Sequence, residues 1–300
     1  YLITGGLGDM GLNLSKYLVS AVQAPVVLTG RTRLPDVSEW DRYVASTSPH
    51  DPIVQRILRL KELKTLGGDV IVVKADASEI GEMRAAFDAA ERKFGPINGV
   101  IHAAGLVAGD AFRPISETDG DLYGRQFQPK ITGLCVLDEL LEERPVDFCV
   151  LISSLSSLLG GLRYAAYASA NAFMDAFAFR RSRTSRFPWM TINWDNWMRT
   201  EDEARLSESK SVPSGFVMTP REGIDAFRRL LSADWGLQMV VSTGDLQARL
   251  DQWVEMKGLK DDEPAAQAQH ARPNLQTEYV APRNDMEKAI AAIWQELLGV

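Results

Sequence analysis

Residues 147–179 read DFCVLISSLSSLLGGLRYAAYASANAFMDAFAF, which predicts a buried strand, a serine-rich turn and a helix. The strand is the apolar run at residues 148–152. The helix begins near Tyr164, from where small and large apolar residues recur at helical spacing and place Tyr167 and Asn171 one turn apart. A serine hydroxyl at the strand's carboxyl end then faces a tyrosine on the following helix, which is where an open α/β sheet carries its active site. From this segment alone, a serine-rich loop beside a core tyrosine is an equally good interpretation.

The first residues predict a strand, a glycine turn and a helix, in the order YLIT, GGLGDMG and LNLSKYLVSAV. Gly5, Gly8 and Gly11 give the pattern GxxGxxG, in which the glycines serve a tight turn, a close approach to a pyrophosphate and helix packing, respectively. The amino terminus of the helix offers unpaired N–H groups and the positive end of its dipole to phosphates. We therefore predict a dinucleotide-binding turn formed by Thr4, Gly5, Gly6, Leu7, Gly8, Met10 and Gly11.

The second predicted strand, residues 26–31, indicates which dinucleotide binds. A cofactor with a free ribose 2′-OH is usually held by an acidic residue after this strand. Here the strand ends in Gly30-Arg31-Thr32, which offers a cation and a hydroxyl to a 2′-phosphate. We expect NADPH rather than NADH, with an exposed surface arginine as the alternative. The ends of the third and fourth strands complete the predicted cofactor site with Asp76 and Ala77, where Asp76 contacts the adenine, and with Ala103, Ala104 and Gly105.

Strands and helices alternate along the first 244 residues. This alternation predicts an α/β fold, a Rossmann-like doubly wound parallel sheet of about seven strands with right-handed crossovers. His102, at the end of the fourth strand, is interpreted as a packed residue rather than a catalyst. Residues 198–217 are polar and follow the sixth strand, so we expect a mobile lid over the substrate. The further predicted strands lie at residues 69–78, 97–104, 148–152, 191–197 (a strand with its exit loop) and 239–244. Helices are predicted at residues 53–66, 80–94, 121–141 (interrupted near Pro129) and 220–231.

The pattern changes after residue 245, where a polar segment rich in Gln, Asp and Ala has the composition of a linker. A new amphipathic helix follows at residues 284–298, with Ile290, Ile293 and Leu297 on one face. We expect a catalytic Rossmann domain at residues 1–246, a linker at 247–283 and the first helix of another domain at 284–300. The chain also starts inside a strand, so we expect it to be a piece of a longer protein.

The composition excludes several classes of partner. The formal net charge is −7 and the Lys and Arg residues are scattered, which argues against a nucleic acid or an anionic membrane. No apolar run approaches 18 residues, so no membrane span is predicted. Cys135 and Cys149 both lie in apolar runs and are predicted to be reduced core residues, which favours a cytoplasmic protein. No metal site is predicted.

Tyr167 is the candidate acid–base residue, and a nearby cation is needed to lower its pKa. A tyrosine with an ordinary pKa of about 10 is a poor acid–base group at neutral pH unless a nearby cation lowers that pKa. Free-standing short-chain reductases mostly carry a lysine one turn after the tyrosine, where this chain has Asn171. The cation must therefore come from elsewhere, and Lys130 on the preceding helix is the candidate.

Taken in order, TGGLGDMG, GRT, HAAG, the pair Pro129-Lys130, SSLSS and YAAYASANAF resemble the ketoreductase domains of modular polyketide synthases over residues 1–244. In that family the lysine and the asparagine exchange places relative to other short-chain dehydrogenases/reductases, which accounts for Lys130 and Asn171. The resemblance assigns the family's serine to Ser154 and the tyrosine to Tyr167, with Tyr164 as a neighbouring decoy. The tail, YVAPRNDMEKAIAAIWQELLGV, resembles the entry and first helix of an acyl carrier domain.

The resemblance implies reduction of the β-carbonyl of a carrier-bound β-ketoacyl thioester by NADPH. Tyr167 would donate a proton, Ser154 would hydrogen-bond the same oxygen, Lys130 would lower the tyrosine pKa, and Asn171 would hold the lysine, the backbone or a water. The implied partners are an acyl carrier domain with its phosphopantetheine-bound chain and neighbouring synthase domains. The family's two stereochemical markers are both missing, because residues 106–110 read LVAGD and Leu159 stands eight residues before Tyr167. The configuration of the product hydroxyl is therefore left open.

Two other functions are compatible with parts of the sequence. The glycine pattern alone permits a reductase or epimerase that acts on a free small molecule, but the tyrosine–asparagine spacing and the carrier-like tail argue against it. A catalytically silent, ketoreductase-like scaffold is the second alternative. Such domains typically lose the tyrosine, the serine or the glycines, and this chain keeps all of them.

Overall fold

The computed structural model describes residues 1–107, 111–198, 217–232, 236–257 and 280–298. The chain divides into two compact units, Tyr1–Val254 and Glu255–Val300. The predicted lid lies almost wholly outside the described residues. In the second unit the described helix is α12, Asp285–Leu298, as the amphipathic pattern predicted, and it exposes Met286, Ile290 and Ile293.

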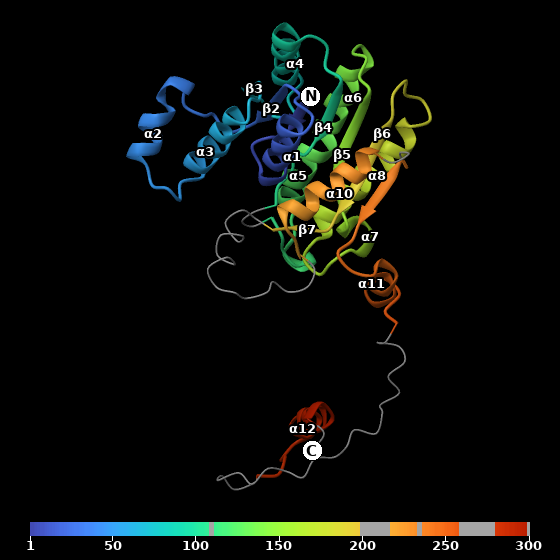
Figure 1. Ribbon diagram of the computed structural model, residues 1–300. Helices are drawn as coiled ribbons and strands as arrows, with labels where there is room; N and C mark the ends of the chain where they lie inside the picture. Colours follow the sequence, from blue (N-terminus) through green and yellow to red (C-terminus); the bar gives the residue numbers. More distant parts are fainter. Residues whose placement is uncertain (108–110, 199–216, 233–235, 258–279, 299–300) are drawn as a thin grey trace. The chain divides into compact units, whose positions relative to one another are not determined.

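The first unit is built on a parallel sheet of seven strands in the order β3-β2-β1-β4-β5-β6-β9, which confirms the predicted fold class (Figure 1). From β1 the chain moves outward to β3 and then returns to β4 on the other side of β1. The sheet therefore has a topological switch point between β1 and β4, and a ligand crevice is expected at the carboxyl ends of these strands. The strands are β1 (Leu2–Thr4), β2 (Val26–Gly30), β3 (Val70–Lys74), β4 (Gly99–His102), β5 (Phe148–Ser154), β6 (Trp189–Trp194) and β9 (Gln238–Val241).

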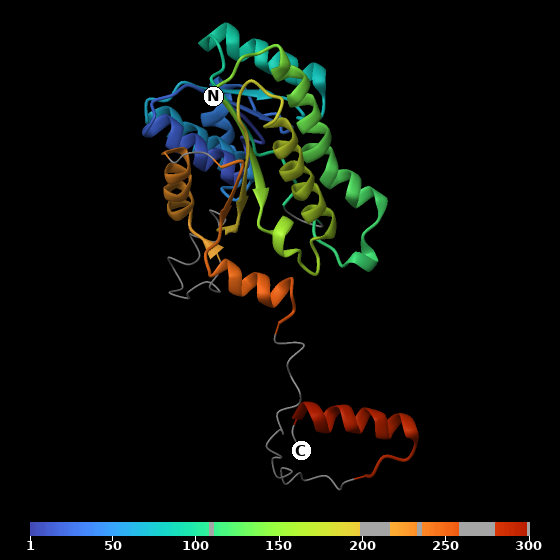
Figure 2. The same ribbon diagram turned by 90° about the vertical axis from the view of Figure 1, so that its right-hand side faces the viewer.

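Helices cover both faces of this sheet, and the apolar residues form one cluster on each face. One cluster packs α4 (Ile80–Phe94), α6 (Gly133–Glu142) and α8 (Ala165–Arg181) against the strands. The other packs α1 (Asp9–Ser20), α3 (Pro52–Thr65) and α10 (Pro220–Ser232). Figure 2 shows this division, with green and yellow helices on one side of the sheet and blue and orange helices on the other.

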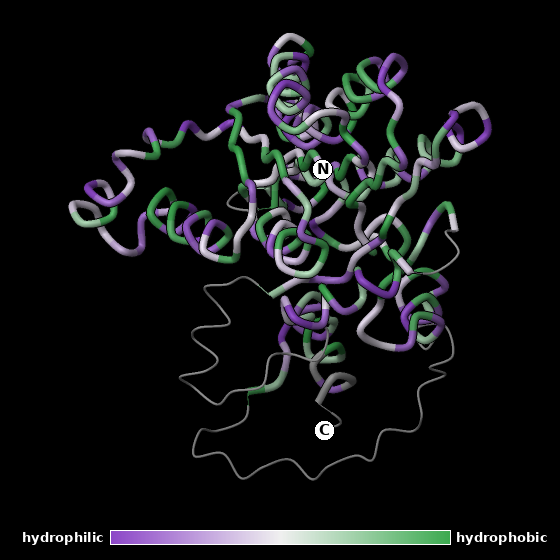
Figure 3. The backbone as a smooth tube through the Cα atoms, turned by 45° about the horizontal axis from the view of Figure 1, so that its top comes forward, coloured by the Kyte–Doolittle hydropathy of each residue, from purple (hydrophilic) through white to green (hydrophobic). Residues whose placement is uncertain are grey.

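The central strands are buried on both faces, which explains why they read as continuous apolar runs rather than as alternating ones. β1, β4 and β6 are buried along their whole lengths. Figure 3 shows the same pattern, because segments of hydrophobic residues lie at the centre of the first unit and hydrophilic segments lie at its periphery. Both edge strands, β3 and β9, are only partly buried.

The helix predicted for residues 121–141 is interrupted at Pro129, as expected. α5 (Gly120–Phe127) ends in a π-helical turn, η3 (Gln128–Thr132), and α6 continues after it. Proline lacks a backbone N–H and cannot continue the α-helical ladder, and π turns often mark functional sites. The short elements in this part of the chain are η1 (Val37–Glu39), α2 (Trp40–Ser46), η2 (Ile115–Glu117) and α7 (Ser156–Leu159).

Three features correct the sequence analysis. Helix α11, Leu246–Trp253, occupies the start of the segment predicted as a linker, and the first unit extends to Val254. Asp245 caps α11 by accepting a hydrogen bond from the backbone of Ala248 at 2.9 Å, and the helix packs against α7. Cys135 is exposed on the outer face of α6, whereas Cys149 is buried as predicted. Beyond the sixth strand, residues Asn196–Trp197 (β7) pair with Val217–Met218 (β8) in a separate two-stranded sheet.

Candidate active site

The glycine turn between β1 and α1 has the close packing that the sequence predicted. Gly5 adopts φ +64°, and a Cβ atom there would lie 2.6 Å from the carbonyl oxygen of Ala103. A Cβ atom on Gly11 would lie 2.7 Å from the Cα of Gly6, so α1 packs directly on the turn. Gly8 is the N-cap of α1 and has an extended backbone, which leaves the first N–H groups of the helix directed away from the helical ladder.

We expect Gly5→Ala to abolish dinucleotide binding. The added methyl group meets backbone atoms that cannot rotate away, and the positive φ is itself unfavourable for alanine. Isothermal titration with NADPH measures this, and circular dichroism reports whether the variant is folded. Gly81→Ala is the matched control, because a Cβ atom there meets nothing within 4 Å. A folded Gly5→Ala variant that binds NADPH as the wild type does would contradict the assignment of this turn.

Two residues of the predicted cofactor turn lie behind the cavity rather than in its wall. Thr4 is fully buried, and its Oγ1 lies 2.7 Å from Nδ1 of His102. The backbone N–H of Gly6 donates to the carbonyl of Thr29 at 2.9 Å, and a Cβ atom on Gly6 would overlap Leu28. Thr4 and Gly6 therefore support the turn from within the sheet. Burial, together with the charge of Lys130, lowers the pKa of His102 to about 3, so His102 is neutral and packed, as predicted.

A cavity of about 970 Å³ lies at the carboxyl ends of the strands, at the switch point. Its wall includes every other residue predicted to bind the cofactor: Gly5, Leu7, Gly8, Met10, Gly11, Arg31, Thr32, Asp76, Ala77, Ala103, Ala104 and Gly105. It also includes Ser154, Lys130 and Tyr167, which are the predicted catalytic residues apart from Asn171. Residues far apart in the sequence thus meet in one cavity, with the glycine turn at one end and the serine–tyrosine pair further along it.

At the end of β2, the cavity wall carries a cationic corner. Arg31 is exposed there and Thr32 is half-buried. Arg56, on α3, donates from Nη1 to the hydroxyl of Thr32 at 3.4 Å and also lines the cavity. Arg56 was not predicted, because its position near Thr32 depends on the packing of α3 rather than on a local motif. Asp76 is turned toward its own loop, since its Oδ1 accepts hydrogen bonds from the backbone and the hydroxyl of Ser78 at 2.9 and 2.7 Å.

Lys130 is buried in the cavity wall, where the π turn places it. Its ammonium nitrogen donates to the carbonyl of Ile152 at 3.1 Å and lies 5.6 Å from the centre of the Tyr167 ring. Burial lowers the pKa of Lys130 to about 7, although the negative charge of Asp175 opposes this shift. Gly105 allows the approach, because a Cβ atom there would lie 3.1 Å from the Cε of Lys130. Lys130 therefore changes its protonation near neutral pH.

The pKa of Tyr167 moves in the direction opposite to the prediction. Burial raises it above the ordinary value, and hydrogen bonds with Ser154 and Asn171 oppose that shift only in part. The sequence favoured a lowered pKa of Tyr167 through Lys130, but in the structure the desolvation of the phenol is the larger effect. Tyr167 is therefore protonated at neutral pH, which is the state required of a proton donor.

Asn171 lies directly behind Tyr167 on α8. Its Nδ2 donates to the backbone carbonyl of Tyr167 at 2.8 Å, and its buried Oδ1 has no hydrogen-bond partner among the described residues. A buried carbonyl oxygen without a partner is costly, so it marks a place for a donor such as a water molecule. In front of Tyr167, the ring of Phe112 meets it edge-on at 5.4 Å and meets Tyr164 at 4.8 Å.

Ser154 is oriented by its neighbour. Its Oγ accepts a hydrogen bond from the backbone N–H of Ser156 at 3.2 Å and one from the Ser156 hydroxyl at 3.0 Å. A serine hydroxyl has two acceptor positions and a single proton to donate. With both acceptor positions taken by Ser156, the proton of Ser154 is left to point elsewhere, toward Tyr167 or toward an oxygen atom in the cavity.

Comparison with known proteins identifies the family. The family model described as "KR domain" matches residues 1–199. The chain belongs to the KR domain family. This KR chain is 32% identical over 278 residues to the polyketide synthase PksM of Bacillus subtilis, covering 91% of the chain and 6% of PksM. It is 32% identical over 198 residues to the 6-methylsalicylic acid synthase of Penicillium expansum, covering 66% of the chain and 11% of that synthase.

Solved structures agree. A ketoreductase from the macrolactin assembly line is 31% identical, with a TM-score of 0.65, and the match covers 84% of this KR chain and 46% of that protein. A ketoreductase domain from the bacillaene assembly line is also 31% identical, with a TM-score of 0.66 over 84% of this chain and 58% of that one. The chain thus spans a small part of the curated synthases and about half of each of these two structures.

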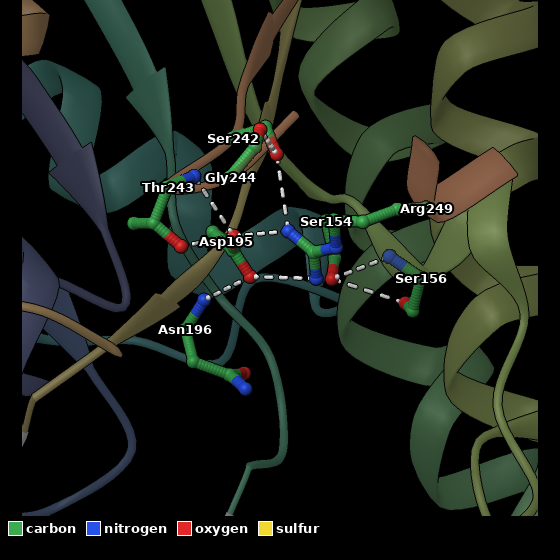
Figure 4. A network of polar contacts seen from close by, with 8 residues as sticks. All are labelled: Ser154, Ser156, Asp195, Asn196, Ser242, Thr243, Gly244 and Arg249. Atoms are coloured by element: carbon green, nitrogen blue, oxygen red, sulfur yellow. Dashed lines mark hydrogen bonds and ion pairs between the residues drawn. The ribbon is translucent and has the colours of Figure 1, made fainter. Parts of the chain in front are cut away.

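The wall of the KR cavity also carries a buried ion pair that was not predicted from the sequence (Figure 4). Asp195, directly after β6, accepts a hydrogen bond from Arg249 of α11 at 2.5 Å and from the backbone N–H and hydroxyl of Thr243 at 3.1 and 2.8 Å. Both members of the pair line the cavity. Burial alone would raise the pKa of Asp195, but the hydrogen bonds from Arg249 and Thr243, with the charge of Arg249, lower it below its usual value.

Among the described residues of this KR chain, no helix is long and apolar enough to cross a membrane, and no cluster of potential metal ligands is found.

Proposed function

We propose that this chain reduces the β-keto group of a carrier-bound β-ketoacyl thioester to a hydroxyl group, with NADPH as the hydride donor, during polyketide biosynthesis. The observation that carries the proposal is the meeting of Ser154, Tyr167 and Lys130 in one cavity with the glycine turn of β1 and α1. Membership of the KR domain family and similarity to polyketide synthases support the choice of substrate.

The glycine turn and the cationic corner fit a dinucleotide with a 2′-phosphate. The turn has no room for side chains at Gly5 and Gly11, and the amino terminus of α1 lies at the cavity, which suits a pyrophosphate. Arg31, Thr32 and Arg56 gather two guanidinium groups and a hydroxyl at the end of β2, where the 2′ position of the adenosine ribose lies in this fold. Guanidinium groups bind phosphate through paired, charge-assisted hydrogen bonds.

When bound in this cavity, NADPH would supply the hydride that the carbonyl carbon needs. Tyr167 donates its phenolic proton to the carbonyl oxygen, so the ketone gains one hydride and one proton and becomes a secondary alcohol. The raised pKa of Tyr167 suits this direction of reaction, because the residue is held in its protonated form. Ser154 hydrogen-bonds the same oxygen with the proton that Ser156 leaves available.

Lys130 and Asn171 assist Tyr167 from behind. The Lys130 ammonium lies 5.6 Å from the Tyr167 ring and, when protonated, stabilises the phenolate that remains after proton donation. The unpartnered Oδ1 of Asn171 can hold a water that returns a proton to this pair. The four residues proposed to carry the reaction are therefore Tyr167, Ser154, Lys130 and Asn171.

The proposal extends to the partners of the chain. The substrate would arrive on the phosphopantetheine arm of an acyl carrier domain, and α12 would be the first helix of such a domain, after a linker. Neighbouring synthase domains would supply the ketone and consume the alcohol. This role favours a cytoplasmic location. Cys135 and Cys149 are both free, which agrees with a reducing compartment.

We expect Arg56→Gln to weaken NADPH binding about 10- to 100-fold while NADH binding changes less than about twofold, since a charged hydrogen bond contributes roughly 1.5–3 kcal/mol. Arg31→Gln should behave in the same way, because both guanidinium groups are assigned to the 2′-phosphate. Arg33→Gln is the control, since Arg33 is exposed and lies outside the cavity wall. Dissociation constants for both cofactors measure the effect. If the affinities for NADPH and NADH fell equally, the cationic corner would not be the binding site of the 2′-phosphate.

The substrate class is tested by competition between ketones. The wild-type chain is given NADPH with a β-ketoacyl pantetheine thioester, and in parallel with a free cyclic ketone and a free sugar substrate. Reduction of the thioester, seen as the β-hydroxyacyl product by mass spectrometry, is the expected result. Preferred turnover of the free ketone or sugar would favour a small-molecule reductase, and cofactor binding without any turnover would favour a silent scaffold.

A further inference from the structure

The substrate end of the cavity is the part that the proposed cofactor leaves open. The glycine turn and the cationic corner take up one end, and Tyr167 and Ser154 stand beyond them. Trp194, Asp195, Trp197 and Arg249 belong to the same wall, and together with Tyr167 and Ser154 they are called the substrate end. An acyl thioester must enter this cavity for its ketone to reach Tyr167. Arg249 comes from α11, far outside the residues 1–199 that match the family model.

Arg249 is fixed by several hydrogen bonds. Its Nη1 donates to Asp195 at 2.5 Å and to the hydroxyl of Ser242 at 3.0 Å, and its Nη2 lies 3.4 Å from the other oxygen of Asp195 (Figure 4). The side chains of Arg249 and Asp195 are only 16% and 4% exposed. Asp195 is in turn tied to Thr243 and to the backbone N–H of Asn196. The pair thus connects the end of β6, the turn after β9 and helix α11.

Helix α11 is connected to Ser154 through α7. α11 packs against α7, whose first residue is Ser156. Ser156 makes the two hydrogen bonds that orient the Oγ of Ser154. A displaced α11 would therefore change both the wall of the substrate end and the support behind Ser154. Replacing a buried ion pair by apolar residues is often neutral for stability, whereas the fixed geometry of its hydrogen bonds is lost.

We propose that Arg249 is a positioning residue for the acyl substrate: held by Asp195, it fastens α11 against α7 and fixes the wall along which the β-ketoacyl thioester lies. This inference rests on the proposed function, because it assigns the substrate end of the same cavity. It also makes α11 a functional part of the ketoreductase unit.

The test compares steady-state constants of three variants of the full chain, Arg249→Met, Asp195→Asn and the double variant. We expect each single variant to raise the KM for a β-ketoacyl pantetheine thioester about tenfold, equivalent to about 1.4 kcal/mol, because the displaced wall holds the thioester less well. The KM for NADPH should change less than about twofold. The double variant should be no worse than either single variant, because the two side chains act as one unit. Arg249→Lys should recover part of the loss, since it keeps the charge.

A second ion pair provides the matched control. Arg181 of α8 pairs with Asp138 of α6 at 2.7 Å, their side chains are 19% and 23% exposed, and neither lines the cavity. Arg181→Met should leave the thioester KM within about twofold of the wild type, and the melting temperatures of all variants report any general loss of stability.

Each remaining outcome overturns the inference. An unchanged thioester KM in Arg249→Met shows that α11 does not set the substrate wall. An effect in Arg249→Met but not in Asp195→Asn shows that Arg249 binds the substrate directly rather than through its partner. Parallel changes in both KM values and in kcat show a merely structural role. If the wild-type chain itself reduces no thioester, the proposed function fails, and this result is distinct from all three.

Discussion

Tyr167→Phe is expected to lower kcat about 1,000-fold, within the range of roughly 10²–10⁴ for removal of a general acid. The substitution removes only the phenolic oxygen, so the edge-on packing against Phe112 is kept. NADPH binding should change less than about twofold, because the glycine turn and the cationic corner are not altered. Stopped-flow measurement of NADPH oxidation under single-turnover conditions gives the rate of the chemical step itself.

The neighbouring tyrosine offers a sharp comparison. Tyr164 lines the same cavity and also contacts Phe112, whereas Tyr167 is the tyrosine whose ring centre lies 5.6 Å from the ammonium nitrogen of Lys130. Tyr164→Phe should keep at least a third of the wild-type kcat. The opposite result, with Tyr164→Phe inactive and Tyr167→Phe active, would falsify the assignment of the proton donor.

Lys130→Met is expected to lower kcat/KM by about 100-fold or more, because it removes the cation that we propose stabilises the Tyr167 phenolate. The same variant should be more stable than the wild type at neutral pH. Lys130 is buried, and burial lowers its pKa to about 7, so folding is opposed by the cost of either burying the charge or losing a proton. We expect the melting temperature of Lys130→Met to rise by several degrees at pH 7.

The sign of the pH dependence follows from the proton balance. An unfolded lysine keeps its proton up to about pH 10.4, whereas folded Lys130 releases it near pH 7. Between these values the unfolded chain binds more protons, so this group makes the wild type more stable as the pH rises. The advantage of Lys130→Met should therefore be largest below pH 7 and vanish toward about pH 10. His102 and Tyr167 face Lys130 as neutral groups, and the charge of Asp175 acts to raise its pKa.

Thermal melts of the two proteins across this pH range test the prediction. Lys64→Met is the control, because Lys64 lies over the ring of Trp40 at 4.6 Å on the opposite side of the sheet from the α4–α6–α8 cluster. Lys64→Met should keep the wild-type activity and the wild-type increase of melting temperature with pH. A Lys130→Met variant that melts below the wild type at pH 7 and keeps full turnover would contradict both halves of the account.

The sequence predicted the sheet well because its strands are buried on both faces and alternate with amphipathic helices. Short-range patterns also predicted the glycine turn, since Gly5 and Gly11 are needed for contacts within one βα unit. The interruption at Pro129 was predictable for the same local reason. Membership of the KR domain family confirms the resemblance on which the assignment of Tyr167, Ser154, Lys130 and Asn171 was based, and their roles stay a prediction.

The remaining features depend on tertiary packing. Arg56 and Arg249 join the cavity from helices whose own sequences carry no sign of a site. Thr4 and Gly6 fit a binding pattern, yet the structure turns them inward toward His102 and Leu28. The direction of the Tyr167 pKa could not be read from the sequence, because desolvation depends on how deeply α8 packs. Helix α11 was missed because its packing partners, α7 and Asp195, lie far away in the chain.

The most direct test of the central claim is the oxidation of NADPH by the wild-type chain in the presence of a β-ketoacyl thioester, followed by absorbance beside the Tyr167→Phe variant. The account predicts thioester-dependent oxidation of NADPH, with one β-hydroxyacyl product formed for each cofactor consumed and almost none in the variant. A folded wild-type chain that binds NADPH but leaves the ketone of the thioester unreduced would contradict it.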